Sequence, residues 1–263
     1  MTVASGVRTD GFLPSPPTEE IVMPQEKLTV SGISIESVPD GWAQAPPGTL
    51  LVPPSGSPAD WETSGWFEPG GWRFPLGGFL LRTADRLILV DAGTHLHRDH
   101  VGWLSVDGEP TFPAAAHHVH AADWATLESG HGEADMGMAD IVRPIGDLVR
   151  LARAERTEIA PGVLLRLVAG HTPGNCLIEV GEGEDRAFLL GDTAHHPATL
   201  VEDGWLDKFD ADRDGARKAR AQLADELEAS GIPAVGAHFD GCRFGRVIRG
   251  RDGSRRWELV DLA

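Results

Sequence analysis

The stretch "THLHRDH" places three histidines and an aspartate within six residues, at His95, His97, Asp99 and His100. It directly follows the apolar run "RLILVD", which predicts a β-strand that ends at Asp91. A packed core would have to give every imidazole nitrogen a hydrogen-bond partner, and a solvated turn does not need three imidazoles. In an extended H-x-H segment alternate side chains point the same way, so two imidazoles can face one metal ion. The stretch therefore predicts a metal-binding loop at the end of a strand.

Three later segments repeat this context, in which an apolar β-type run ends at a potential ligand. The runs "GVLLRLVAGHT", "NCLIEVGEGEDRAFLLGDT" and "IPAVGAHF" end near His171, Asp192 and His238. Such strand ends can collect at one end of a sheet, where imidazole and carboxylate suit borderline-soft zinc and a carboxylate can bridge two cations. Taken singly, each histidine is better explained as a hydrogen-bonded surface or core residue. The four matching contexts together favour a metal site.

The sequence resembles the metallo-β-lactamase-fold hydrolases, in which H-x-H-x-D-H is followed by G-H-T-P-G, a strand-end G-D and a late histidine. The resemblance covers roughly residues 76 to 263. It implies an α/β fold, an αββα sandwich of two mixed β-sheets flanked by helices, with a dinuclear site at one edge of the sheets. The ligands that it implies are His95, His97 and His171 for one ion, Asp99, His100 and His238 for the other, and Asp192 as the bridge.

The resemblance also implies an activity. Two divalent metal ions per chain, zinc in the first place and iron or manganese as alternatives, would support a hydrolase in which metal-bound hydroxide attacks a small ester, lactone or phosphotriester. Asp99 would orient the hydroxide as well as bind metal. Lactonases of this superfamily commonly carry a tyrosine three residues after the bridging aspartate, whereas this chain has no tyrosine and has His195 there. His195 or His196 is therefore a candidate proton donor or substrate contact, with a structural role as the alternative, and Trp103 is a candidate pocket wall.

The chain departs from the family pattern at one join. In the family, the strand that ends in D-x-G leads into a helix and another strand before the histidine motif, but here Gly93 is followed at once by Thr94. A crossover between neighbouring parallel strands needs about a dozen residues or more. We therefore predict that one helix–strand unit is absent after Gly93, that one sheet is a strand short, and that the strand at 86–91 supports the ligand loop.

Alternative functions follow from the same residues. An impaired or inactive metal-binding relative would result if the join displaces the loop. A glyoxalase II-like thioesterase shares the ligands but normally adds a helical domain, and only 25 residues follow His238. A persulfide dioxygenase-like enzyme with one iron is a further alternative. The β-lactamase branch is disfavoured because it generally lacks the bridging aspartate, and the absence of G-x-S-x-G disfavours a serine hydrolase.

Charge and the first residues bear on partners and location. Lys and Arg number 23 against 40 Asp and Glu, a net charge of −17, which repels nucleic-acid phosphates and anionic membranes. We expect a small-molecule substrate and neither a nucleic-acid nor a membrane partner. The first residues lack a secretory pattern, which predicts a cytoplasmic protein. The prolines among residues 1–25 predict an extended N-terminal arm, with the folded domain at 26–263.

Three helices are predicted from apolar spacing, at Ala121–Leu127, at Ile141–Ala152 and over "DRDGARKARAQLADELEAS", where Gly231 is the stop. The acidic run 210–215 imitates an EF-hand loop, but its twelfth position is Ala221 where a glutamate is needed. Acidic residues there are better explained as complementing the start of the last helix. "HHVH" at 117–120 predicts surface or strand histidines.

Overall fold

The computed structural model describes residues 26–46, 48–57, 60–67, 71–91, 96–129 and 138–261. Within these ranges it leaves out the side chains of Asp40, Glu62, Thr63, Asp91, Arg98, Asp99 and Met138. The predicted arm at 1–25 lies outside the described residues, so its division from the folded domain stays a prediction.

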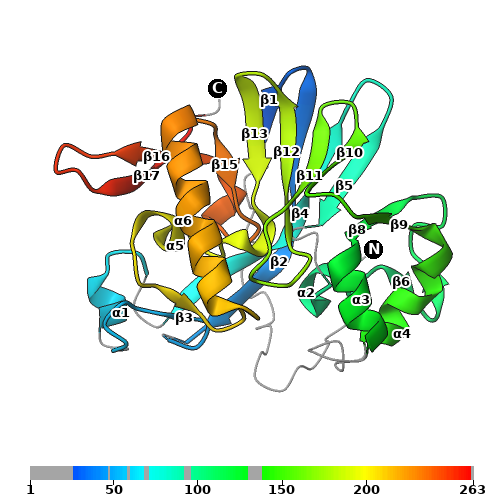
Figure 1. Ribbon diagram of the computed structural model, residues 1–263, viewed down its shortest axis with the longest axis horizontal. Helices are drawn as coiled ribbons and strands as arrows, with labels where there is room; N and C mark the ends of the chain where they lie inside the picture. Colours follow the sequence, from blue (N-terminus) through cyan, green and yellow to red (C-terminus); the bar gives the residue numbers. More distant parts are fainter. Residues whose placement is uncertain are drawn as a thin grey trace.

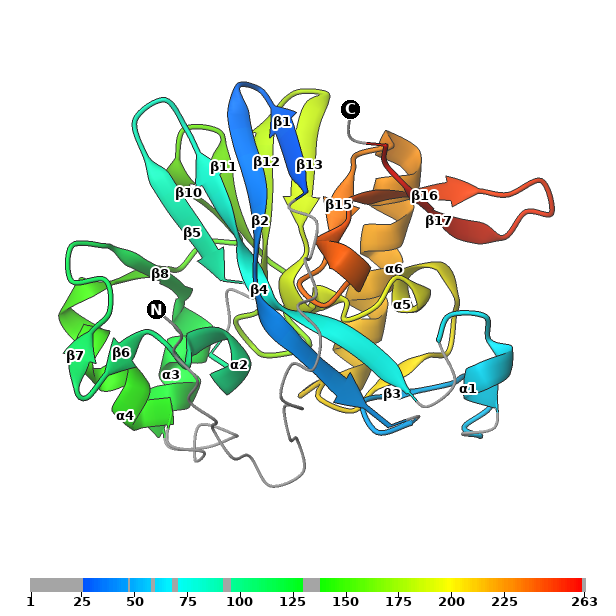
Figure 2. The same cartoon turned by 180° about the vertical axis from the view of Figure 1, so that it is seen from behind.

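Four strands near the N-terminus form an antiparallel sheet in the order β1-β2-β4-β5. They are β1 (Lys27–Val30), β2 (Ile33–Ala45), β4 (Trp72–Arg82) and β5 (Leu87–Asp91). The predicted turn between the last two strands is present, since the Thr83 N–H donates to the Arg86 carbonyl oxygen at 3.0 Å. This four-stranded sheet lies in front in Figure 2.

The second sheet has seven strands in the order β10-β11-β12-β13-β15-β16-β17. They are β10 (Arg156–Ala160), β11 (Val163–Leu167), β12 (Cys176–Glu182), β13 (Asp185–Leu189), β15 (Ala234–Val235), β16 (Gly245–Arg249) and β17 (Arg255–Leu259). The sheet is mixed, because β13 pairs with β15 in parallel while the other pairs are antiparallel. The strands that the sequence predicts to end near His171, Asp192 and His238 are β11, β13 and β15.

The main core lies between the two sheets. Ile35, Phe79 and Leu81 of the four-stranded sheet pack in one buried cluster with Leu165 and Ile178 of the seven-stranded sheet. Because side chains alternate across a strand, each sheet turns one apolar face inward. This packing fixes the two sheets against each other and so fixes the relative positions of the loops at their ends.

The outer face of the seven-stranded sheet is covered by α6 (Arg213–Ser230), which crosses it in Figure 1. Leu223, Ala224 and Leu227 of α6 share a buried cluster with Leu177 and Phe188 of the sheet. Together the sheets and helices form the predicted αββα sandwich, except that the four-stranded sheet is antiparallel where the sequence predicts two mixed sheets.

Helix α6 begins and ends at residues that are typical of helix starts and stops. The Asp212 side chain accepts a hydrogen bond from the Gly215 N–H at 3.0 Å and caps the first turn. Gly231 ends the helix in the left-handed conformation, with φ of 65°, which glycine adopts without a steric cost from Cβ. This helix is therefore confirmed where the sequence predicts it.

The remaining elements are short. The helices are α1 (Asp60–Thr63), α2 (Arg98–Val101), α3 (Ala121–Ser129), α4 (Met138–Val142) and α5 (Ala198–Val201), with 3-10 turns η2 (Arg143–Leu148), η3 (Gly191–Thr193) and η4 (Asp240–Cys242). Two-stranded sheets pair β3 (Leu51–Val52) with β14 (Leu206–Asp207), β6 (Ser105–Val106) with β7 (Glu109–Pro110), and β8 (His117–His120) with β9 (Val149–Ala152). None of the helices in the described part of the chain is long and apolar enough to cross a membrane.

The predicted helix at Ile141–Ala152 is wrong. Only α4 reaches into it, η2 follows, and the last four residues form strand β9. Pro144 lacks a backbone N–H and its ring obstructs a continuing α-helix. The segment "VRLA" then pairs in parallel with β8, which outweighs the helical spacing of its apolar residues.

The predicted gap after Gly93 is consistent with the topology. Only residues 92–97 separate β5 from α2, too few for a helix and a strand. Among the described residues β5 pairs with β4 alone, and β8 and β9 form a sheet apart from it. The strand β5 itself therefore leads into the histidine loop.

Truncation of Leu223 to alanine tests the contact between α6 and its sheet. Leu223 is buried, so Leu223→Ala should lower the free energy of unfolding by about 2–5 kcal/mol through lost burial and a residual cavity. Urea denaturation measures this change. Gln222→Ala, at the exposed neighbouring position, should stay within about 0.5 kcal/mol of the wild type. Equal losses for both variants would contradict this packing.

Candidate metal centre

Four imidazoles surround one buried carboxylate at the end of the seven-stranded sheet. Asp192, in η3 after β13, is 1% exposed. Its Oδ2 lies 3.0 Å from Nε2 of His195, 3.2 Å from Nε2 of His100 and 3.5 Å from Nε2 of His171. Its Oδ1 lies 3.5 Å from Nε2 of His238. These contacts join segments that are far apart in the sequence.

The histidine loop after β5 contributes one imidazole beside His171 and another beside Asp192. His97 stands just before α2 and His100 within it, and the His100 N–H donates to the His97 carbonyl oxygen at 3.1 Å. This turn directs the His97 Nδ1 to 3.2 Å from Nε2 of His171 and brings His100 to Asp192. His97 and His100, in the segment that follows β5, therefore reach different members of the same cluster.

Two groups of potential ligands result, each with its donor atoms within 4.8 Å of one another. They are His97, His171 and Asp192, and His100, Asp192 and His238. The structure brings these five residues together, and their role as metal ligands stays a prediction. His95 lies outside the described residues and the Asp99 side chain is not described, so their roles stay predictions. Trp103 is 55% exposed, and its place at a pocket wall also stays a prediction.

The predicted ligands are held from behind by groups that no sequence motif indicates. The His238 Nδ1 lies 3.0 Å from the Pro75 carbonyl oxygen on β4, to which it can donate, so the ring is tied to the other sheet. The His171 Nδ1 lies 3.4 Å from Oδ1 of Asp210, whose carboxylate receives both guanidinium nitrogens of buried Arg220 at 2.7 and 3.3 Å. In both rings Nε2 is then directed at Asp192. A carboxylate or carbonyl behind the imidazole is the usual support of a metal-ligating histidine.

Asp123 of α3 holds the "GHTPGN" loop. Its carboxylate accepts from the Thr172 hydroxyl at 2.8 Å and from the Gly174 N–H at 2.6 Å. Burial raises the pKa of Asp123, and these two hydrogen bonds oppose the rise. The aspartate thus fixes the backbone on the C-terminal side of His171.

His195 and His196 are neighbours in sequence but lie in different surroundings. The His195 Nδ1 is hydrogen-bonded to the buried carboxylate of Asp207. Burial alone would lower the pKa of His195, but Asp207 and Asp192 outweigh it and hold the pKa well above its usual value. Burial lowers the pKa of His196 to about 3, its Nδ1 accepts from the Ala198 N–H, and its ring lies 4.5 Å from that of Phe67. Of the two, only His195 faces Asp192.

The sequence indicates only part of the role of the two carboxylates that lie behind His195 and His171. Asp207 and Asp210 lie in "LDKFDADRDG", whose last six residues the sequence predicts to be the acidic start of α6. That interpretation is right for Asp212, which caps the helix, and incomplete for Asp210. Nothing local distinguishes the two, because the His171 contact depends on how α6 packs against the loop.

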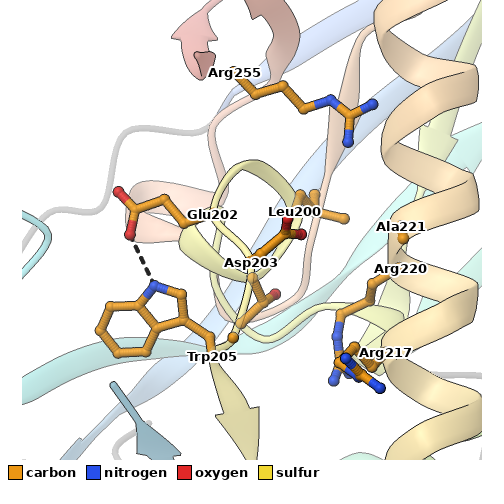
Figure 3. Close-up of a pocket in the computed structure, with 10 residues that line it drawn as sticks. Leu200, Glu202, Asp203, Trp205, Arg217, Arg220, Ala221 and Arg255 are labelled. Carbon is orange, nitrogen blue, oxygen red and sulfur yellow. Dashed lines mark hydrogen bonds between the residues drawn. The ribbon is translucent and has the colours of Figure 1, made fainter. Parts of the chain in front are cut away.

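A small hollow lies beside this region but outside the histidine cluster. It is lined by Trp205, Glu202, Arg220 and Arg255 among others, as Figure 3 shows, and has a volume of about 20 Å³, room for one water. The Glu202 carboxylate accepts from the Trp205 indole N–H at 2.9 Å on its rim. Its size excludes it as a substrate site.

The comparisons with known proteins agree with this geometry. A family model described as the metallo-beta-lactamase superfamily matches residues 94–235, more than half of the chain. The chain belongs to the metallo-β-lactamase superfamily.

Solved structures extend the likeness to most of the fold. The hydrolase AbOPH of the β-lactamase superfamily matches with a TM-score of 0.77 at 17% identity, over 91% of this chain and 98% of that one. AidC, a dizinc quorum-quenching lactonase in complex with a product, matches with a TM-score of 0.76 at 17% identity, over 91% and 97%. A probable metal-dependent hydrolase from Staphylococcus aureus matches at 0.73 and 16%, over 90% and 100%. No curated protein matches in sequence. At these identities the likeness establishes the fold.

Replacement of Gly170 tests how α6 positions His171. A Cβ at Gly170 would lie 2.5 Å from the backbone of Ala216 in α6, and its φ of +145° disfavours other residues. Gly170→Ala should therefore destabilise the protein and weaken zinc binding, measured by thermal unfolding and by equilibrium dialysis. Gly146→Ala is the control, because a Cβ there has no neighbour within 4 Å. Unchanged zinc affinity in Gly170→Ala would contradict this account of His171.

Proposed function

We propose that the protein is a metal-dependent hydrolase that uses two divalent metal ions, zinc in the first place, on a small ester, lactone or phosphotriester. The observation that carries the proposal is that two groups of donors share Asp192. One group has His97 and His171, and the other has His100 and His238. A carboxylate between two sets of imidazoles is suited to bridge a pair of cations.

The described residues fit such ions by their chemistry and their spacing. Ligand atoms that lie about 2.0–2.2 Å from one zinc ion are separated from each other by roughly 3–4 Å. The separations are 3.2 Å between His97 and His171, 3.2 Å between His100 and Asp192, and 3.5 Å between His238 and Asp192. Imidazole with carboxylate suits zinc, iron and manganese, so the donor set alone leaves iron and manganese as alternatives.

The bound ions would supply Lewis-acid polarisation of the substrate oxygen and a water made acidic near neutral pH. The protein's own groups prepare the place where this chemistry occurs. Asp192 joins the two donor sets, and the Pro75 carbonyl and Asp210 keep the His238 and His171 rings turned toward it. His100, His171 and His238 are buried, which limits the water that competes for these positions.

Several features support a lactone or another small ester as substrate. The neighbour AidC is a lactonase whose structure contains an acyl-homoserine product. The charge of −17 disfavours nucleic-acid substrates. Two donor groups favour two ions over the single iron of a dioxygenase-like enzyme.

A substrate screen tests the proposal. The zinc-loaded protein should hydrolyse at least one of a lactone, an aryl ester and a phosphotriester, and lose this activity when a chelator removes the metal. A thioester is tested alongside these substrates, because turnover of the thioester would favour the thioesterase alternative. Zinc-loaded protein without turnover on any of the three would contradict the proposed hydrolase and favour an inactive relative.

Asp192→Ala tests the shared carboxylate. The substitution removes the group common to both donor sets and leaves imidazoles without a balancing charge, so we expect loss of at least one bound ion and a fall in turnover by orders of magnitude. Metal content by mass spectrometry and initial rates measure the two effects. Asp203→Ala, at an exposed acidic position, is the matched control and should keep both. Asp192→Ala with two ions and full rate would remove Asp192 from the site.

A further inference from the structure

His195 meets the same carboxylate as the predicted ligands do. Its Nε2 lies 3.0 Å from Oδ2 of Asp192, closer than Nε2 of His100 at 3.2 Å or of His171 at 3.5 Å. Its ring is close to two of these imidazoles, with its centroid 5.0 Å from that of His171 and 5.3 Å from that of His238. By position, His195 belongs to the same cluster, although it is not a member of either three-residue donor group.

The other ring nitrogen of His195 is fixed in the manner of a metal ligand. Nδ1 is hydrogen-bonded to Oδ2 of Asp207, and Oδ1 of Asp207 accepts from the Phe209 N–H at 3.0 Å. Asp207 is itself held in β14, which pairs with β3. A carboxylate behind an imidazole determines both the tautomer and the direction of the ring. The Pro75 carbonyl does the same behind His238, and Asp210 lies 3.4 Å behind Nδ1 of His171.

This arrangement has an electrostatic consequence. Nδ1 is taken by Asp207, so the ring reaches Asp192 only through Nε2, at 3.0 Å. Without a metal ion, a proton on Nε2 bridges this contact. A divalent cation next to Asp192 can take the place of that proton and bind the lone pair of Nε2.

The geometry points to His195 as a further ligand of the metal pair, bound through Nε2 and positioned by Asp207. The inference rests on the proposed metal-dependent function and extends its ligand set beyond the residues that the family motif provides. It also decides between the roles that the sequence leaves open for His195, because an Nε2 that binds metal is not available to donate a proton to a leaving group. Asp207 acts through His195 and is a positioning residue.

Metal binding by the full-length protein tests the inference directly. Wild type, His195→Gln and Asp207→Asn are freed of metal and dialysed against buffered zinc, and bound zinc per chain is measured by mass spectrometry. Cobalt(II) is then added in place of zinc and its visible absorption recorded, since the d–d bands report the ligands around the ion. We expect His195→Gln to bind one of the two ions at least 10-fold more weakly and to change the cobalt bands. Asp207→Asn should weaken binding by about 10- to 100-fold, as is typical for loss of a group that orients a ligand.

His196→Gln is the matched control. It makes the same substitution at the next position, in a ring that is also buried but whose Nδ1 is taken by the Ala198 N–H and that packs on Phe67. Its zinc affinity and cobalt spectrum should equal those of the wild type. Circular dichroism and thermal unfolding of the metal-free proteins establish that each variant is folded. If His195→Gln does not fold, the nearly isosteric Asp207→Asn carries the test alone.

The outcomes separate this inference from the proposed function. Wild-type zinc affinity and an unchanged cobalt spectrum in folded His195→Gln, or in Asp207→Asn where that variant stands alone, overturn the assignment of His195 and leave the proposed hydrolase intact. Wild-type protein that binds neither zinc nor cobalt overturns both. Weaker binding in His195→Gln and Asp207→Asn but not in His196→Gln supports the assignment.

Discussion

The buried carboxylate of Asp192 is the constraint on which the rest of the site depends. A carboxylate that is 1% exposed requires compensating positive charge or hydrogen bonds, because its desolvation costs several kcal/mol. Here four imidazoles from three loops and one helical turn surround it. The two-sheet core and α6 bring these loops to one end of the fold. The geometry of the site therefore depends on the packing of the whole domain.

Fixed groups behind the imidazoles set the direction of their rings. Asp207 and the Pro75 carbonyl are hydrogen-bonded to Nδ1 of His195 and His238, and Asp210 lies 3.4 Å from Nδ1 of His171. Nε2 of each ring is therefore turned inward. The orientation of each ring is therefore set before any ligand arrives, which lowers the entropy that binding must overcome. It also explains why α6 lies against the site: Arg220 of this helix holds Asp210, and the backbone of Ala216 leaves room only for glycine at position 170.

Many of the strands, the last helix and five candidate ligands could be predicted from the sequence, because local residue patterns indicate them. Apolar runs that end in His171, Asp192 and His238 predict both strands and ligands, and the capped helix α6 follows from Asp212 and Gly231. The predicted helix over 141–152 failed because pairing of β9 with β8 is a non-local contact that outweighs spacing. The supporting Asp207 and Asp210 were not found, since an aspartate before a helix has the same local signature whether it caps the helix or reaches an imidazole across the fold.

The central claim is that the imidazoles around Asp192 hold a pair of divalent cations. Anomalous diffraction at the zinc absorption edge, from crystals grown with zinc, tests it most directly because the signal locates the metal without assuming a ligand. The account predicts two anomalous peaks on either side of Asp192, with ligand nitrogen and oxygen atoms at about 2.0–2.2 Å. Zinc peaks only at surface sites, with the Asp192 cluster empty at saturating zinc, would contradict it.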